Sequence, residues 1–379
     1  MAIFKLYHCP IPCSFGHESG LMAIAGRMVR AARRQYPFTR RGLTDRSREV
    51  GSLASRISFV NPAADHVLVV TNPSAGARSR SEAIAELVNC LKERGLSAEV
   101  VCDFPSFDAL VKRYRAAGQL RAVVAAGGDG TVAEIVNRSE PDVPLTVFPL
   151  GTANLLANYF ALVCDPAALA STLAEGAIAR FDAGKANGRI FLSMVGCGFD
   201  GDVVRRLHQK RDGGHISYWT WAMPILETIR SYRYPGLRVH CSLAAGGEVA
   251  MTTHRARWAF VINLPDYGGG LQLVREAVAT DGVLDLCLFE NGSLWHGLKY
   301  LGFVKLGRHR ALSDAKTARL TRVRIESDDR VPYQLDGDPG GFLPLDIEVL
   351  PERVTLLAGR SRFLALGLES AAPQSAGAR

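Results

Sequence analysis

Between residues 66 and 150 the chain alternates apolar runs with segments of helical periodicity, and this alternation restricts its fold more than any other feature. Helix 79–95 ends on Gly95, a residue type that commonly caps helix C-termini. Strands are predicted at 66–71, 97–101, 121–127 and 144–150, and further helices at 107–118 and from Thr131 onward. Strands that alternate with helices form a parallel sheet with helices on both faces.

After about residue 178 the pattern changes to short runs rich in Val, Ile, Leu and Phe, bounded by Gly, Asn and Asp. Such runs predict a second, β-rich and mostly antiparallel domain. Two helices, at 217–233 and 294–307, are expected to interrupt it. The fold class is therefore an α/β domain with a parallel sheet, followed by an antiparallel β sandwich.

The composition is that of a globular protein, because 47% of the 379 residues are hydrophobic. No apolar run reaches the ~18–20 residues of a membrane-spanning helix, and no secretory signal pattern is present. The eight cysteines, scattered through apolar stretches, favour reduced thiols in a cytoplasmic protein. The first 60 residues hold ten Lys/Arg against three Asp/Glu. This basic head contains no known nucleic-acid-binding motif, so no nucleic-acid partner is expected.

A glycine-rich turn, AAGGDGTVAEIVN at 125–137, joins the third predicted strand to the third helix. Gly127, Gly128 and Gly130 let the backbone turn tightly and expose N–H groups, which together with the helix N-terminus attract a phosphate. Asp129 would repel a bare phosphate. Its carboxylate makes sense if Mg²⁺ or a water lies between the two, or if it faces a phosphoryl acceptor. The alternative is an ordinary strand-to-helix turn.

Two other loops also follow predicted strands and precede helices. TNPSAGARSR at 71–80 offers Asn72, Ser74 and Gly76, and PLGTANLLAN at 149–158 repeats the arrangement. In a parallel sheet such loops meet at the carboxyl edge of the strands, where ligands bind. Neither loop contains the Gly-Lys-Ser/Thr of a P-loop.

In this order and spacing, NPSAG, GGDGT and PLGTAN resemble the diacylglycerol kinase catalytic domain, a family that includes soluble bacterial lipid kinases and sphingosine kinases. Segments 191–204, 263–289 and 333–341 are similar to motifs of that family's C-terminal domain. The resemblance covers about residues 66 to 358. It implies an α/β domain like those of phosphofructokinase and NAD kinase, with an interdomain cleft.

The resemblance further implies an ATP- and Mg²⁺-dependent kinase that phosphorylates the primary hydroxyl of a membrane lipid, of the diacylglycerol, monoacylglycerol or sphingoid-base type. The expected organisation is a basic extension at 1–62, a nucleotide-binding domain at 63–177, a lipid-binding catalytic domain at 178–365 and a disordered tail at 366–379. The implied nucleotide contacts are Asn72, Pro73, Ser74, Ala75, Gly76, Gly128, Asp129, Gly130, Thr131, Val132, Ala133, Glu134 and Thr152.

Two aspartates flank a glycine in QLDGDPGG, namely Asp336 and Asp338. Many family members have Asp-Gly-Glu here, with the Glu as proton acceptor, so the resemblance assigns that role to Asp338. The carboxylate is kept but stands one methylene closer to the backbone. The alternative is that Asp-Gly-Asp is only a tight hairpin turn.

The segment VATDGVLDL at 278–286 contains an Asp-Gly pair at Asp281. In soluble bacterial relatives this Asp binds a structural Mg²⁺ with flanking main-chain carbonyls, and the matching positions are Val278 and Val283. Oxygen-only ligation suits Mg²⁺. A hairpin turn explains the Asp-Gly pair nearly as well.

The head contains two further patterns. Residues 21–36 can be written as a basic amphipathic helix, which predicts peripheral association with an anionic membrane surface, and a disordered extension is the alternative. A zinc set is conceivable at His8, Cys9, Cys13 and His17, although its Cys spacing is one residue too long.

Other interpretations of the sequence stay open. Helix 217–233, with two Trp, is core packing or the lining of an acyl pocket. The alternatives to lipid phosphorylation are a kinase of a soluble acceptor, as in NAD kinase, and a catalytically inactive lipid- or nucleotide-binding homologue. A homodimer is compatible with the sequence.

Overall fold

The computed structural model describes residues 56–71, 78–209, 231–245, 248–266 and 271–370, together with Thr228. Leu53–Arg379 form one compact unit, and a second unit, Met1–Ser52, lies outside the described residues. The features predicted for the head, the loop Asn72–Gly76 and most of helix 217–233 also lie outside them.

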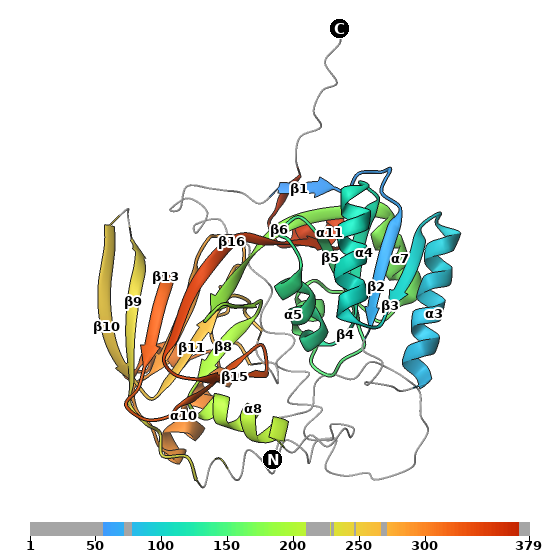
Figure 1. Ribbon diagram of the computed structural model, residues 1–379. Helices are drawn as coiled ribbons and strands as arrows, with labels where there is room; N and C mark the ends of the chain where they lie inside the picture. Colours follow the sequence, from blue (N-terminus) through green and yellow to red (C-terminus); the bar gives the residue numbers. More distant parts are fainter. Residues whose placement is uncertain are drawn as a thin grey trace, which may run out of the picture. The chain divides into compact units, whose positions relative to one another are not determined.

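The first half of the described chain forms a parallel sheet in the order β3–β2–β4–β5 (Figure 1). Its strands are β2 (His66–Thr71), β3 (Ser97–Val101), β4 (Leu120–Gly127) and β5 (Pro144–Pro149). The helices between them are α3 (Arg78–Glu93), α4 (Phe104–Ala116) and α5 (Asp129–Arg138). The alternation predicted from the sequence is confirmed.

Both faces of this sheet are buried, which explains its continuous apolar strands. Successive residues of β2 enter different hydrophobic clusters. Val67 and Val69 pack with α3 and with α7 (Pro166–Glu175), whereas Leu68 and Val70 pack with α4 and α5. The helices are thereby fixed on the two faces, and the strand ends are left for the connecting loops.

The second half is a β sandwich whose strand pairs are antiparallel. Its strands are β6 (Ala177–Ala186), β7 (Arg189–Phe191), β8 (Met194–Cys197), β9 (Leu237–Ala245), β10 (Glu248–Ala256), β11 (Trp258–Ile262), β12 (Leu284–Phe289), β13 (Ala315–Glu326), β14 (Pro332–Leu335), β15 (Asp338–Phe342) and β16 (Leu345–Leu357). Its main helices are α8 (Phe199–Gln209) and α10 (Leu294–Lys305). Among the described residues, no helix is both long and apolar enough to cross a membrane.

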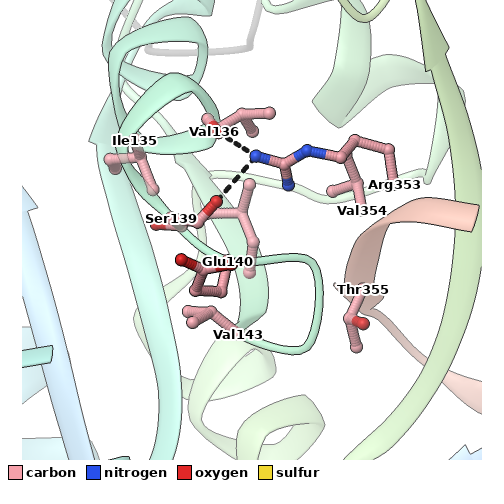
Figure 2. Close-up of a pocket in the computed structure, with 9 residues that line it drawn as sticks. Ile135, Val136, Ser139, Glu140, Val143, Arg353, Val354 and Thr355 are labelled. Carbon is pink, nitrogen blue, oxygen red and sulfur yellow. Dashed lines mark hydrogen bonds between the residues drawn. The ribbon is translucent and has the colours of Figure 1, made fainter. Parts of the chain in front are cut away.

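One strand is shared between the two halves. β16 runs antiparallel to β6 and also pairs in parallel with β5, where Thr355 lies opposite Pro144. Its residue Arg353 donates to the backbone carbonyls of Val136 (3.0 Å) and Ser139 (2.7 Å) at the end of α5 (Figure 2). The helix that follows the glycine turn is thus anchored at its far end by the second half.

Two boundaries differ from the sequence predictions by three residues or more. Helix α4 begins three residues early, at Phe104, because the Asp103 carboxylate accepts the Ser106 N–H at 2.8 Å and Pro105 fits the first turn. Residues 366–370, predicted as part of a disordered tail, include β17 (Glu369–Ser370), which pairs in parallel with β1 (Arg56–Phe59). The remainder of the predicted tail lies outside the described residues.

Candidate active site

The glycine turn after β4 is built for close approach between backbones. A methyl group on Gly127 would collide with the Thr131 hydroxyl, and one on Gly128 would lie 3.2 Å from the Cα of Gly151. None of the turn's glycines has a positive φ. Gly127 and Gly128 are therefore needed for space, and not for the left-handed backbone that a tight turn often requires.

The loop after β5 packs directly against this turn. The N–H of Leu150 donates to the carbonyl of Gly127 at 3.0 Å. The Asn154 side chain braces the loop by bonding both the N–H (3.1 Å) and the carbonyl (2.9 Å) of Gly151. Two of the three loops expected at the carboxyl edge therefore meet, as the sheet topology predicted. The third, Asn72–Gly76, lies outside the described residues.

Asp129 has a partner that the sequence did not suggest. The backbone N–H groups of Asn154, Leu155 and Leu156, at the start of α6 (Leu155–Tyr159), lie close to its carboxylate and lower its pKa. Burial, the larger effect, and the nearby Asp336 raise that pKa to about 6. Asp129 thus joins the glycine turn to α6. Burial and the charge of Asp336 disfavour its ionised form, and a nearby cation would offset this unfavourable free energy.

The β14–β15 hairpin carries the two aspartates of the Asp-Gly-Asp turn. Asp336, at a φ of +50°, accepts backbone N–H groups from Leu192 (2.7 Å), Ser193 (2.8 Å) and Met194 (2.9 Å). Burial raises its pKa, and these three bonds oppose that shift. The carboxylate oxygens of Asp336 thereby bind the backbone of residues 192–194, and this fixes the position of the hairpin against that segment.

The second aspartate of the hairpin faces the first domain. Asp338 is the first residue of β15, and its Oδ2 lies 3.5 Å from the place that a Cβ on Gly130 would occupy. The Asp-Gly-Asp turn is therefore a real hairpin turn, and it also delivers a carboxylate to the glycine turn. The hairpin turn is thus observed, and the proton-acceptor role of Asp338 stays a prediction.

A buried glutamine that sequence reasoning missed supports the hairpin. The Gln334 side chain donates to Asp200 Oδ2 at 2.9 Å, and its oxygen accepts the N–H of Gly337 at 2.8 Å. Gln334 is 1% exposed. Space for Asp200 depends on Gly196, where a methyl group would collide with its carboxylate. Asp200 lies in segment 191–204, where the resemblance assigned no role to this acid. The sequence therefore gave no indication of its contact with Gln334.

Asp281, predicted to bind a structural Mg²⁺ with Val278 and Val283, has a charged protein partner. The Asp281 carboxylate is ion-paired with the Arg319 guanidinium, which brings a positive charge from β13. Within the described residues, no group of three or more His, Cys, Asp or Glu side chains has metal-site geometry. A guanidinium and a divalent cation compete for one carboxylate, so the Arg319 pairing opposes the Mg²⁺ site at Asp281, Val278 and Val283, which stays a prediction.

The other residues with implied nucleotide contacts differ in accessibility. The side chains of Val132 and Ala133 are buried, so a nucleotide would meet only their backbone atoms. Glu134 lies 3.6 Å from Arg138 and 3.9 Å from Arg189, and Thr152 is exposed.

Two small cavities in the described part of the chain are both too small for a nucleotide. Each has a volume of about 10 Å³, enough for roughly one water. The first lies beside Arg353 at the far end of α5 (Figure 2). The buried Ser139 hydroxyl that lines it has no hydrogen-bond partner in the described structure, so the cavity suits a structural water.

Comparison with known families places both halves of the chain. Residues 66–186 match the diacylglycerol kinase catalytic domain, and residues 193–358 match the YegS C-terminal NAD kinase β-sandwich-like domain. The fold and these matches define a two-domain kinase, with an α/β catalytic domain followed by a β sandwich.

Relatives agree along most of their length. A diacylglycerol kinase of Mycobacterium tuberculosis is 28% identical over 305 residues, covering 78% of this chain and 95% of that protein. A Pseudomonas fluorescens protein named "Probable lipid kinase YegS-like" is 30% identical over 276 residues, covering 70% and 86%. A crystal structure of a diacylglycerol kinase from Bacillus anthracis has the same fold, with a TM-score of 0.59 at 22% identity over 78% of this chain and 98% of that one. The chain belongs to the diacylglycerol kinase family.

Proposed function

We propose that this protein is a lipid kinase that transfers the γ-phosphate of ATP to the primary hydroxyl of a membrane lipid of the diacylglycerol or sphingoid-base type. Family membership supports kinase activity, and the names of the relatives support a lipid acceptor. The observation that carries the site is the position of Asp338, whose carboxylate from the second half lies against Gly130 of the glycine turn.

In this proposal the glycine turn and the N-terminus of α5 receive the phosphates through backbone N–H groups. The contacts assigned to nucleotide binding are those given above for residues 72–76, 128–134 and 152. The charge of Asp336 contributes to the raised pKa of Asp129, and that of Asp338 to the raised pKa of Asp336, which fits a region that receives a cation with its substrate. Mg²⁺ carried by ATP would neutralise the phosphate charge that develops during transfer.

Asp338 then accepts the proton of the lipid hydroxyl as its oxygen attacks the γ-phosphorus. The bond between that phosphorus and the β–γ bridging oxygen breaks, ADP leaves, and the proton passes from Asp338 to solvent. Asp336 and Gln334 do not take part in proton transfer. They hold the turn so that Asp338 keeps its place.

The test is ATP turnover by the purified chain with a mixed lipid extract and Mg²⁺. Asp338→Asn is expected to abolish turnover and leave ATP affinity nearly unchanged, because the residue faces the acceptor. Asp338→Glu restores the commoner family residue and is expected to remain active. Asp346→Asn is the matched control, since that aspartate pairs with Arg324 on an exposed part of β16.

Three results would contradict the proposal. Turnover with NAD and not with lipid would indicate a soluble acceptor. ATP binding without turnover on either would indicate an inactive homologue. An active Asn variant beside an inactive Glu variant would show that Asp338 serves only the geometry of the turn.

A further inference from the structure

Helix α10 exposes an unusual amount of apolar surface. Of the eight large hydrophobic side chains that are exposed in the described part of the chain, four lie within residues 294–306. Trp295 is 77% exposed, Leu298 50% and Leu306, just beyond the helix, 69%. Together with Leu294 these side chains form what we call the α10 face.

The opposite side of α10 already provides the packing that holds the helix. Tyr300 and Val304 are buried, and the Tyr300 ring stacks on Phe289 with centroids 4.3 Å apart. Ser293 caps the helix by accepting the His296 N–H at 3.2 Å. A surface helix normally turns polar residues outward. Helix α10 is apolar on its packed side and also on the α10 face. The packing of the helix therefore does not explain why the α10 face is apolar.

The segment that carries the α10 face has charges of one sign. Residues 294–312 include four Lys/Arg and no Asp or Glu. The acids nearest to them in the fold are engaged, because Asp314 pairs with Lys299, Glu290 with Lys316 and Glu276 with Arg310. Lys305 and Arg308 are exposed beside Leu306. Two copies of this face would therefore repel each other, whereas a partner that is both apolar and anionic would be attracted.

The α10 face is connected to the candidate active site by packed aromatic rings. Gly297 lets the Trp258 ring come close, since a Cβ there would lie 3.3 Å from it. Trp258 in turn packs on Phe199, the first residue of α8, with centroids 5.1 Å apart. α8 packs against β14 and β15, the hairpin that carries Asp338 (Figure 1). Helix α10 is thus linked through packed side chains to the hairpin that carries the proposed proton acceptor.

We propose that the α10 face docks the protein on an anionic lipid bilayer, with Trp295 and Leu298 entering the interfacial region and Lys305 and Arg308 facing lipid phosphates. This inference rests on the proposed function, because a kinase whose acceptor stays in the bilayer has to work at its surface. Trp and Leu beside basic residues are the composition that favours the membrane interface. The bilayer supplies both the apolar phase and the negative charge that a second copy lacks.

The experiment measures co-sedimentation with vesicles of phosphatidylcholine, with and without phosphatidylglycerol, in the absence of nucleotide. The double variant Trp295→Ser/Leu298→Ser is expected to lose at least roughly tenfold in partitioning onto the anionic vesicles, because two apolar side chains no longer leave water. Val163→Ser is the matched control, since Val163 is 58% exposed and lies outside α10. Lys305→Gln/Arg308→Gln is expected to weaken binding to anionic vesicles only, with the loss largest at low salt.

Wild-type protein that fails to bind anionic vesicles, or a Trp295/Leu298 variant that binds them as wild type does, would overturn the docking proposal. So would a double variant that changes the oligomeric state in sedimentation velocity and leaves vesicle binding intact, because the face would then join two copies. Failure of the proposed function is seen separately, as the absence of wild-type turnover on a short-chain, water-dispersed diacylglycerol.

Discussion

Arg319 offers the sharpest test of how the loop beside the predicted magnesium position is stabilised. Its guanidinium pairs with Asp281, and the two side chains are only 29% and 22% exposed. Arg319→Met keeps most of the volume and the aliphatic stem and removes the charge. Asp281 then keeps its own charge in a largely dehydrated place, without the cation that faced it.

The magnitude follows from the burial of the pair. Breaking a fully buried ion pair by removing one partner costs about 3–5 kcal/mol, and the partial exposure here reduces this to about 2–3 kcal/mol. For a unit of this size about 2 °C of Tm correspond to each kcal/mol, so we expect a fall in Tm of about 4–6 °C. Mg²⁺ should restore part of that loss in Arg319→Met, because the carboxylate and nearby carbonyls then lack a competing cation.

The assay is thermal unfolding of nucleotide-free protein with a chelator and with added Mg²⁺. Wild type should give the same Tm in both, since Arg319 already balances the charge of Asp281. Arg322→Met is the control on the same strand, where the arginine is 74% exposed and pairs with Glu348, and it should cost at most about 1 kcal/mol. A wild-type Tm that falls on chelation and recovers with Mg²⁺ would refute this reasoning, as would an unchanged Tm in Arg319→Met.

Three further changes test the site. Asp129→Asn should slow turnover roughly 10²-fold. Asp129 has a pKa of about 6 in the folded protein against an ordinary 3.8, so the free energy of unfolding of wild type should rise as pH falls through that interval. In denaturant titrations the free energy of unfolding of the variant should depend less on pH. Gly151→Ala puts a methyl group 2.7 Å from Asn154 Oδ1 and into the Gly128 backbone, so calorimetry should show a loss of stability of more than about 1 kcal/mol, together with weaker ATP binding. Gln334→Leu should lower kcat about tenfold with little change in the KM for ATP, because it releases Gly337 of the hairpin.

The sequence predicted the parallel half of the fold well, because a strand buried on both faces is a continuous apolar run and its neighbouring helices are amphipathic. It predicted the sandwich as a class and missed particular strands. β10 reads EVAMTTHRA, which has no clear alternation, and it owes its place to nine paired positions along β9. β15 reads DPGGF and is set by its hairpin partner β14. Such strands depend on cross-strand contacts that no local pattern contains.

In the candidate site too, some residues could be predicted from the sequence and others could not. Glycines that follow a strand and precede a helix can be found in a linear sequence, and the resemblance supplied a role for Asp338. The contacts of Asp129 with α6, of Gln334 with Asp200 and of Asp281 with Arg319 join residues 25 to 134 positions apart. A side chain's partner at such separations is decided by tertiary packing, so residue type and spacing alone could not have assigned these three.

The structure also bears on whether an aspartate is long enough to act where many relatives have a glutamate. Three backbone N–H groups on Asp336 and the bond from Gly337 to Gln334 hold the hairpin in place, so the turn cannot shift to bring a short side chain closer. It has no need to, because Asp338 Oδ2 is already 3.5 Å from the Cβ position of Gly130. The missing methylene therefore leaves no gap on the side of the glycine turn. A glutamate at 338 would stay on the same fixed hairpin, and its additional methylene can be accommodated by the torsions of its own side chain, so we expect both residues to support turnover.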